Sequence, residues 1–454
     1  DASRYDGVRR VERARASFGR IVDSVGVPVI AVQPGAFAGS ALDCSTRVTE
    51  PLELLTSAML ASMQGAEIAA TPAGWESVTS GMDARDLRFG DAGTRCAEVA
   101  IAWSCANQLA YGRAWSALLA DMPYHGIASA LDALHVPYRA VEVGTFHRGL
   151  AGVKLLVLPD LAVLSERAEA EIRAFVDGGG ALLATGATGL ADDVGEPRSC
   201  GRLDDVLGVH RASVHRLDAI TAQVDHGFVA DPPLGRLYGP ATEHSYIRLL
   251  PELARQTPGP HVDREPRVAT SDRHPILDGF GSTDLLAYGG RIRPMEVQPD
   301  RAVLATLVPA FPSMPIEEVY PRPERTDIPA IVVGEFGSGR VAYLPADIDR
   351  RYGADPLPDH LALLGNIVNW LIGSTDTAVS CTNGSVLSSW WDTSDGLRLH
   401  LLNITGLGQS GGQRRSLPPA RHITVRARKA EFSVDHLDRY LVRSVTPERT
   451  ERHR

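Results

Sequence analysis

Two almost entirely apolar runs, separated by one amphipathic helix, restrict the fold of this chain more than any other feature. The runs are residues 153–159 (VKLLVLP) and 181–185 (ALLAT), and the helix covers 165–176, beginning at a serine suited to cap it. Strands with apolar residues at nearly every position are typical of parallel sheets covered on both faces. A helix between two such strands is their usual connection. The pattern predicts a three-layer α/β domain with a flavodoxin-like open sheet.

More elements of the same kind flank this unit. Residues 98–104 and 138–143 are predicted to form further strands, with a helix over 122–134. Residues 329–348 predict a β-hairpin, because the glycine-rich GEFGSGR joins two apolar strands and supplies positions for positive φ. A phosphate-binding loop would instead join a strand to a helix. A helix over 359–373, ended by a glycine, follows the hairpin.

The two ends of the chain differ from this middle part. Strand-like residues 27–32 and 67–72 enclose a helix over 50–66, and this β/α unit indicates a remnant of a (β/α) barrel with too few units to close. After residue 373, short alternating strands predict a small antiparallel β-sandwich, in which Trp390 and Trp391 are expected to pack. We therefore expect four parts: 1–90 (barrel remnant), 91–373 (α/β domain), 374–440 (β-sandwich) and 441–454 (tail).

Composition argues against several classes of function. The net charge of −9 gives no drive toward nucleic acid or an anionic membrane surface. No apolar run approaches the roughly 18 residues of a membrane span. The five cysteines are scattered without a C-x-x-C pair, and the 14 histidines contain no H-E-x-x-H motif. We expect no metal, no cofactor and a reduced, cytoplasmic setting.

The turn after the second apolar run raises the question of catalysis. In many α/β enzymes such a turn carries a serine or cysteine nucleophile at the carboxyl edge of the sheet. Here Gly186, Ala187, Thr188 and Gly189 supply no thiol, and no histidine lies within twenty residues to act as a base. We interpret the turn as structural, with Gly186 at positive φ and with Thr188→Ala leaving activity and assembly nearly intact. An amidohydrolase that uses Thr188 is the weakest alternative.

Two long segments resemble a known family. They are LAGVKLLVLPDLAVLSERAEAEIRAFVDGGGALLATGATGLADDVGEPR (150–198) and GSGRVAYLPADIDRRYG (337–353). Both are similar to the middle domain of bacterial β-galactosidases of glycoside hydrolase family 42 and related hypothetical glycosyl hydrolases. That domain, called the β-galactosidase trimerisation domain, looks like the class I glutamine amidotransferase fold. The resemblance covers about 100–430, and residues 45–68 resemble the end of the family's catalytic barrel more loosely.

The resemblance implies where catalytic groups would lie. Retaining glycosidases use two carboxylates about 5–5.5 Å apart. The family's order of parts places the acid/base carboxylate upstream of Asp1, so this chain would hold at most the nucleophile. Glu50 is the candidate nucleophile, although a carboxylate at a helix N-terminus is also favoured electrostatically. Gln33 and Trp75 would bind the sugar, the tryptophan by stacking. Other carboxylates near these strand ends are Asp43, Glu53, Glu67 and Glu76.

The resemblance also implies a function. The chain would be the C-terminal part of a β-galactosidase-like glycoside hydrolase, serving mainly for oligomerisation and active-site closure, and an enzyme only together with an N-terminal barrel. Its partners would be a carbohydrate substrate and two further copies in a trimer, with a contact surface expected around residues 186–198. The alternative from another class is a non-catalytic carbohydrate-binding or scaffold protein with a degenerate amidotransferase-like domain.

Overall fold

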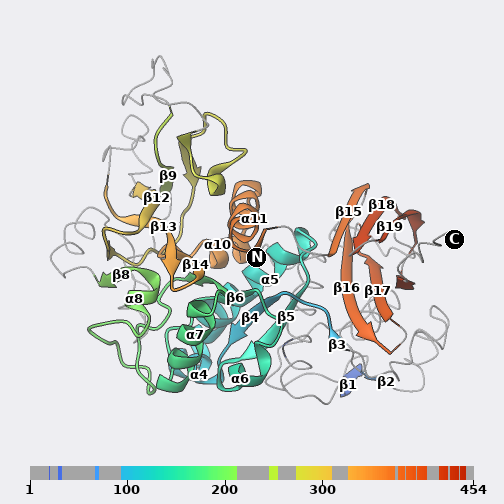
Figure 1. The fold of residues 1–454 in the computed structure, drawn as a ribbon, viewed down its shortest axis with the longest axis horizontal. Coiled ribbons are helices and arrows are strands. Elements are labelled where there is room, and N and C mark those ends of the chain that lie inside the picture. The colour runs from blue at the N-terminus through green and yellow to red at the C-terminus, as the bar shows by residue number, and fades with distance from the viewer. Residues whose placement is uncertain are drawn as a thin grey trace, which may run out of the picture. The chain divides into compact units, whose positions relative to one another are not determined.

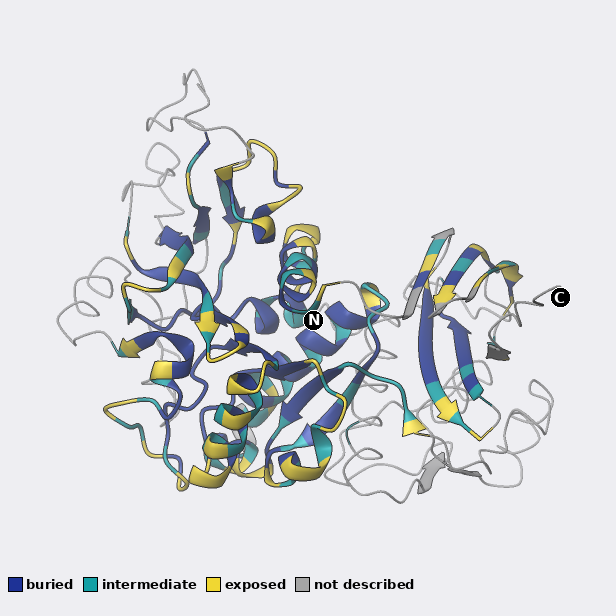
Figure 2. Cartoon of the chain, viewed as in Figure 1, coloured by how far each residue is buried: buried dark blue, intermediate teal, exposed yellow. Residues whose placement is uncertain are grey.

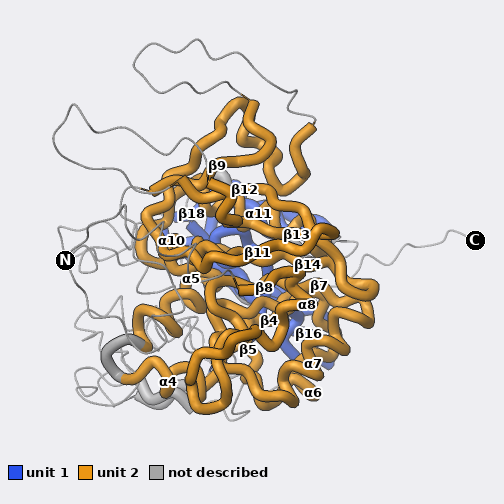
Figure 3. Tube along the Cα trace, turned by 90° about the vertical axis from the view of Figure 1, so that its left-hand side faces the viewer, with its two compact units in different colours: residues 1–98, 131–140, 375–454 blue, residues 99–130, 141–374 orange. Residues whose placement is uncertain are grey.

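The chain divides into two compact units. A computed structural model describes 94–211, 245–253, 272–308, 326–373, 377–383, 385–394, 396–405, 419–427, 430–438 and 440–445, together with residues 20, 29–32 and 67–70 (Figure 1). One unit comprises 99–130 and 141–374, and the other comprises 1–98, 131–140 and 375–454 (Figure 3).

A nine-stranded mixed sheet runs through the larger part of the described chain. Its order is β10-β9-β12-β13-β14-β7-β6-β4-β5. The strands are β4 (Val99–Trp103), β5 (Tyr138–Glu142), β6 (Leu155–Leu158), β7 (Ala181–Thr185), β9 (Tyr246–Leu249), β10 (Leu285–Ala287), β12 (Ala302–Val308), β13 (Pro329–Phe336) and β14 (Gly339–Leu344). Neighbours from β4 to β14 pair in parallel, whereas the neighbours from β14 to β10 pair antiparallel. The predicted strands and the hairpin of β13 and β14 are confirmed, but the antiparallel extension through β12, β9 and β10 was not predicted.

Helices follow most of the parallel strands. They are α4 (Cys105–Ser116), the π-helix η2 (Ala117–Asp121), α5 (Met122–Ala133), η3 (Val143–Thr145), α6 (Phe146–Gly149), α7 (Glu166–Asp177), α8 (Asp204–Leu207), η6 (Pro275–Leu277), α10 (Ile348–Ala354) and α11 (Pro358–Ile372). The Ser165 hydroxyl accepts the N–H of Ala168 at 3.2 Å, so α7 has the predicted serine cap. Gly373 follows the last residue of α11, as predicted. Of the helices that the structure describes, none is long and apolar enough to cross a membrane.

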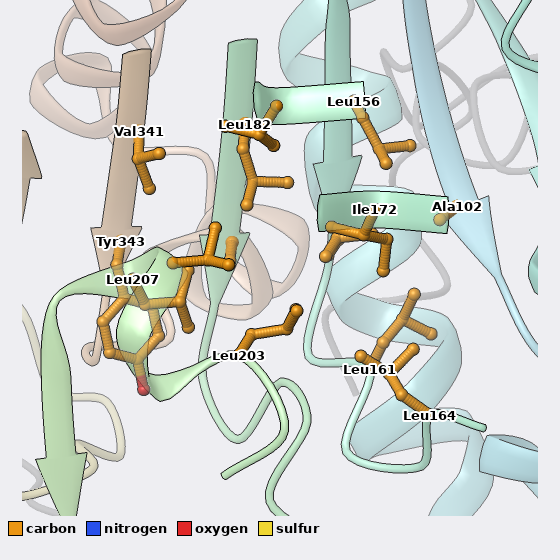
Figure 4. Close-up of a cluster of buried hydrophobic side chains, with 14 of the residues drawn as sticks. Ala102, Leu156, Leu161, Leu164, Ile172, Leu182, Leu203, Leu207, Val341 and Tyr343 are labelled. Carbon is orange, nitrogen blue, oxygen red and sulfur yellow. The ribbon is translucent and has the colours of Figure 1, made fainter. Parts of the chain in front are cut away.

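One hydrophobic cluster of this unit lies on one face of the parallel strands, and residues of the opposite face, such as Ile101, Val157 and Leu183, are buried as well. Leu156 of β6, Leu182 of β7 and Ile172 of α7 belong to a cluster of fully buried side chains (Figure 4). The central strands are buried along most of their length (Figure 2), which explains why their sequences are apolar at nearly every position. A short pair, β8 (Val209–Arg211) with β11 (Met295–Val297), adds Val209 and Met295 to the same cluster. Burial of each such leucine stabilises the fold by ~1.5–3 kcal/mol.

In the other unit, the described strands that follow residue 376, together with β3, form two antiparallel sheets. Their orders are β15-β18-β19 and β20-β17-β16-β3. The strands are β3 (Thr94–Arg95), β15 (Thr377–Asn383), β16 (Val386–Thr393), β17 (Gly396–Asn403), β18 (Ala420–Ala427), β19 (Ala430–Leu437) and β20 (Tyr440–Val445). Trp390, Leu399 and Ile423 share one buried cluster that draws on both sheets. Trp391 packs its ring against the Arg95 guanidinium at 5.2 Å, so both tryptophans pack as predicted.

One predicted boundary needs correction. Residues 441–445, assigned to a tail, belong to β20, which pairs with residues 397–402 of β17. The sequence pattern hid this strand because Arg443 interrupts its apolar residues. At the N-terminal end, β1 (Val29–Val32) and β2 (Glu67–Ala70) pair in parallel, as expected for strands of one β/α unit.

Candidate functional site

The turn after β7 is hydrogen-bonded to the neighbouring strand β14. Gly186 has φ 56°, which confirms the predicted positive φ, and Gly189 has φ 75°. The N–H of Gly186 donates to the carbonyl of Leu344 at 2.9 Å, and the Tyr343 hydroxyl donates to the carbonyl of Gly186 at 2.7 Å. Both partners belong to β14, which pairs with β7 in parallel. The turn is therefore fixed by the sheet itself.

Thr188 does not present its hydroxyl to solvent. The residue is 2% exposed, and its Oγ1 lies 2.7 Å from the carbonyl oxygen of Thr185 and 3.1 Å from that of Leu158. The same oxygen accepts the N–H of Leu161 at 3.2 Å. A nucleophile must reach its substrate and have a base beside it. The amidohydrolase alternative based on Thr188 is therefore wrong for this geometry.

Asp160 links the loop after β6 to the turn after β7. Its backbone has φ 49°, a conformation that aspartate tolerates better than most residues. Its Oδ1 accepts the N–H of Ala187 at 2.9 Å, and its own N–H donates to Thr185 Oγ1 at 3.0 Å. The Asn107 side chain of α4 donates to the Asp160 carbonyl at 3.2 Å and accepts the N–H of Val163 at 3.2 Å. Three segments that follow parallel strands are thus joined by buried hydrogen bonds.

A fully buried carboxylate completes this network. Asp349, in α10 after β14, accepts the hydroxyl of Thr185 and, at 2.8 Å, the N–H of Arg350. Burial raises the pKa of Asp349 to about 6, although both hydrogen bonds oppose the rise. Asp347 lies beside it and accepts the Arg350 guanidinium at 2.5 Å and the Tyr288 hydroxyl at 2.8 Å.

Asp160 and Asp349 were not predicted as members of this site. Asp160 lies two residues after the end of β6 and Asp349 lies five residues after the end of β14, so both belong to segments that leave the carboxyl ends of parallel strands, and that position was the available signal. That position does not predict that the Asp160 N–H and the Asp349 carboxylate both bond to the Thr185 hydroxyl, or that the Asp160 carboxylate accepts the N–H of Ala187. The arrangement fixes loops and offers no exposed nucleophile with a base. Among the residues that the structure describes, no group of three or more His, Cys, Asp and Glu side chains is placed to hold a metal ion.

Most of the residues predicted to form the sugar site are not among those that the structure describes. Glu50, Gln33 and Trp75 fall outside the described residues, as do Asp43, Glu53 and Glu76. Glu67 is the first residue of β2 and pairs in register with Val29. Their roles in catalysis and sugar binding stay predictions.

The Thr188 contacts revise the expected effect of removing its hydroxyl. Thr188→Ala leaves the buried N–H of Leu161 without its acceptor, so we expect a loss of ~1–3 kcal/mol in the free energy of unfolding. Thr188→Ser keeps the hydroxyl and is expected to lose less. Urea unfolding followed by circular dichroism measures both. An alanine variant that unfolds at the wild-type urea concentration would show that these hydrogen bonds contribute nothing.

Part of the α/β unit matches a family model named for β-galactosidases. The family model described as the β-galactosidase trimerisation domain matches residues 97–231, which include β4, β6, β7 and the turn after β7. This match confirms the resemblance predicted from the sequence. No curated protein matches the chain.

Solved structures of glycoside hydrolases share this fold at low sequence identity. The β-galactosidase from Rahnella sp. R3 aligns with a TM-score of 0.58 and 14% identity over 97% of this chain and 58% of its own. The GH42 β-galactosidase Gan42B aligns with a TM-score of 0.58 and 13% identity, over 95% of this chain and 56% of its own. The α-L-fucosidase isoenzyme 2 from Paenibacillus thiaminolyticus aligns with a TM-score of 0.57 and 16% identity, over 91% of this chain and 59% of its own. This chain therefore spans less than two thirds of the length of each of these relatives.

Proposed function

We propose that this chain is the assembly part of a β-galactosidase-like glycoside hydrolase, and that it forms a trimer through its α/β domain (91–373). The observation that carries the proposal is the match of residues 97–231 to the β-galactosidase trimerisation domain. The amidotransferase-like, flavodoxin-like description of this domain is part of the proposal. So is a location in the cytoplasm, which is supported by the four free cysteines of the described chain.

The chemistry of the sheet edge supports an assembly role. In a flavodoxin-like sheet, ligands bind outside the carboxyl ends of the parallel strands. Here Asp160, Thr185, Thr188 and Asp349 are all buried at that edge and bonded to one another or to nearby backbone groups. Such a network makes the edge rigid. A rigid edge suits a surface that must keep one shape in order to fit another subunit.

The substrate in this proposal is a glycoside, bound where an upstream barrel and this chain meet. Glu50 would be its nucleophile and Gln33 and Trp75 its sugar contacts, with the acid/base carboxylate on the upstream barrel. The chain would close the site rather than hold the whole carboxylate pair. The titles of the similar structures name β-galactosidases and an α-L-fucosidase, so the proposal extends to glycosides and to no single sugar.

The proposal is tested by the mass of the chain in solution. We expect sedimentation velocity and light scattering at tens of micromolar to show one discrete species near three times the 48.7 kDa chain mass. Nonspecific clumping through exposed apolar surface would give a broad distribution that grows with concentration. A single species at the monomer mass at these concentrations would refute the trimer.

A further inference from the structure

An uncharged surface faces solvent on the first turns of α4. Cys105, Ala106 and Leu109 are exposed there, while Asn107 and Tyr111 are buried. An amphipathic surface helix normally carries polar or charged residues on its solvent side. Leu109 is 75% exposed, and it is one of the two large hydrophobic side chains that are exposed in the described part of the chain.

The second exposed hydrophobic side chain belongs to a loop that packs against the same helix. Val194, 80% exposed, precedes Gly195, which packs against α4 so closely that an added Cβ would lie 2.8 Å from the Cβ of Ala110. Leu109 and Val194 are thus the sequence neighbours of two residues in contact. We name Cys105, Ala106, Leu109 and Val194 the α4 patch.

The loop that carries Val194 is held in a defined conformation. The Asp192 carboxylate accepts the N–H of Val194 at 3.0 Å and that of Glu196 at 2.9 Å. The Gly195 N–H donates to the Asp192 carbonyl at 3.0 Å, and the Asp192 N–H donates to the Glu196 carbonyl at 2.9 Å. The closed turn holds Val194 outward. A fixed, exposed apolar side chain is a contact that needs no ordering when a partner binds.

We infer that the α4 patch is the surface through which one copy of this chain contacts the next, and that it docks on residues 148–154 of that copy. The inference rests on the proposed trimer. Asp193 and Glu196 are exposed beside Val194 and give the patch an acidic rim, in which Asp193 also lies 3.4 Å from the Arg202 guanidinium. The segment 148–154 has the complementary character: Arg148 and Lys154 are exposed on either side of exposed Ala151 and Gly152. Both surfaces lie within the region that matches the trimerisation domain.

The positions of the two surfaces fit a closed ring. A cyclic trimer uses two different patches on each subunit, because each contact is head to tail. The helices that carry or adjoin these patches, α4 and α6, lie on opposite sides of the unit (Figure 3). One copy therefore presents both surfaces at once, each to a different neighbour.

Charge placed in the apolar centre tests the α4 patch. We expect Leu109→Glu and Val194→Glu to weaken association at least about tenfold in sedimentation experiments, since each places a carboxylate in the apolar centre of the contact, opposite Ala151 and Gly152, where it loses its hydration. Ser338→Glu adds the same charge to the exposed turn between β13 and β14 and should leave the trimer intact. Circular dichroism and urea midpoints establish that each variant is folded.

A charge exchange tests the partner surface. Glu196→Lys and Arg148→Glu should each weaken the trimer, and the double variant should recover part of the loss because the opposite charges face each other again.

The alkylation rate of Cys105 reports on the same contact without a substitution in the wild-type chain. In the trimer, peptide-resolved alkylation of Cys105 by N-ethylmaleimide should be slower, relative to exposed Cys200, than in the Leu109→Glu variant.

The outcomes separate the inference from the proposed function. A wild-type chain that is monomeric would refute both. A wild-type trimer that Leu109→Glu and Val194→Glu leave unchanged, with Cys105 alkylated as fast as in a monomer, would overturn the patch while the trimer stands. Loss of the trimer in the single charge variants without recovery in the double variant would overturn residues 148–154 as the docking surface.

Discussion

Gly126→Ala is expected to lower the free energy of unfolding of the α/β unit by about 3 kcal/mol or more. Gly126 lies in α5, where alanine would otherwise gain ~1 kcal/mol from its helix propensity. A Cβ at this position would lie 1.9 Å from the carbonyl oxygen of Asp349 and 3.1 Å from the backbone nitrogen of Gly353. Both are backbone atoms of α10, so they cannot turn aside as a side chain can. The clash therefore outweighs the gain in propensity.

Urea unfolding followed by circular dichroism measures this effect. Ser129→Ala, on the same helix at a partly exposed position, is the matched control and should change stability little. If Gly126→Ala is as stable as the wild type while Ser129→Ala is also unchanged, then α5 and α10 do not approach as closely as the structure shows.

The second large effect is a dependence on pH that Asp349 introduces. Its pKa is 3.8 in the unfolded reference state and about 6 in the folded protein, because burial disfavours the charged carboxylate. Between these two values the folded state binds more protons, so the contribution of Asp349 to stability falls as pH rises from about 4 to about 6. The loss is ~3 kcal/mol and is fully present above pH 6.

Asp349→Asn isolates this contribution from those of the other carboxylates. The difference in unfolding free energy between wild type and variant should change by about 2–3 kcal/mol in the variant's favour between pH 4 and pH 7. Asparagine offers a single acceptor to the Thr185 hydroxyl and the Arg350 N–H, which sets a constant cost at every pH. Besides burial, the groups that shift the pKa of Asp349 are Thr185 and Arg350, which lower it, and Asp347, which raises it. Parallel stability curves for the two proteins would show that folding does not change the pKa of Asp349.

The sequence predicted those parts of the fold whose signal is local. The apolar runs at β6 and β7 marked a parallel pair, Ser165 marked the start of α7, and the glycines of GEFGSGR marked the hairpin of β13 and β14. The strands β9 and β10 were not predicted because they are short and lie far in the chain from the strands with which they pair. The helix α4 was not predicted for another reason: its first turns expose Cys105, Ala106 and Leu109 to solvent, so this part of the helix lacks the alternation of apolar and polar residues that marks a surface helix.

The same limit applies to the site. The positive φ of Gly186 followed from a glycine-bounded turn, which is a local property. The burial of Thr188, and hence its hydrogen bonds to the segment after β6, depends on how that segment folds back over the turn. The bond between Thr185 and Asp349 joins residues 164 positions apart. Nothing in either local sequence specifies that contact, because it arises when β14 inserts next to β7.

The place of β14 in the sheet has a consequence for how the chain is made. β7 is flanked by β6, which is synthesised shortly before it, and by β14, which is synthesised more than 150 residues later. At ribosomal rates of about 5–20 residues per second, roughly 10–30 s pass between the two strands. During that time the nascent chain presents an unpaired edge of β7, with the hydroxyl of Thr185 open to water and no Asp349 to receive it. The centre of the finished sheet is thus its last part to close during translation, and an unpaired apolar strand edge is a template for wrong pairing.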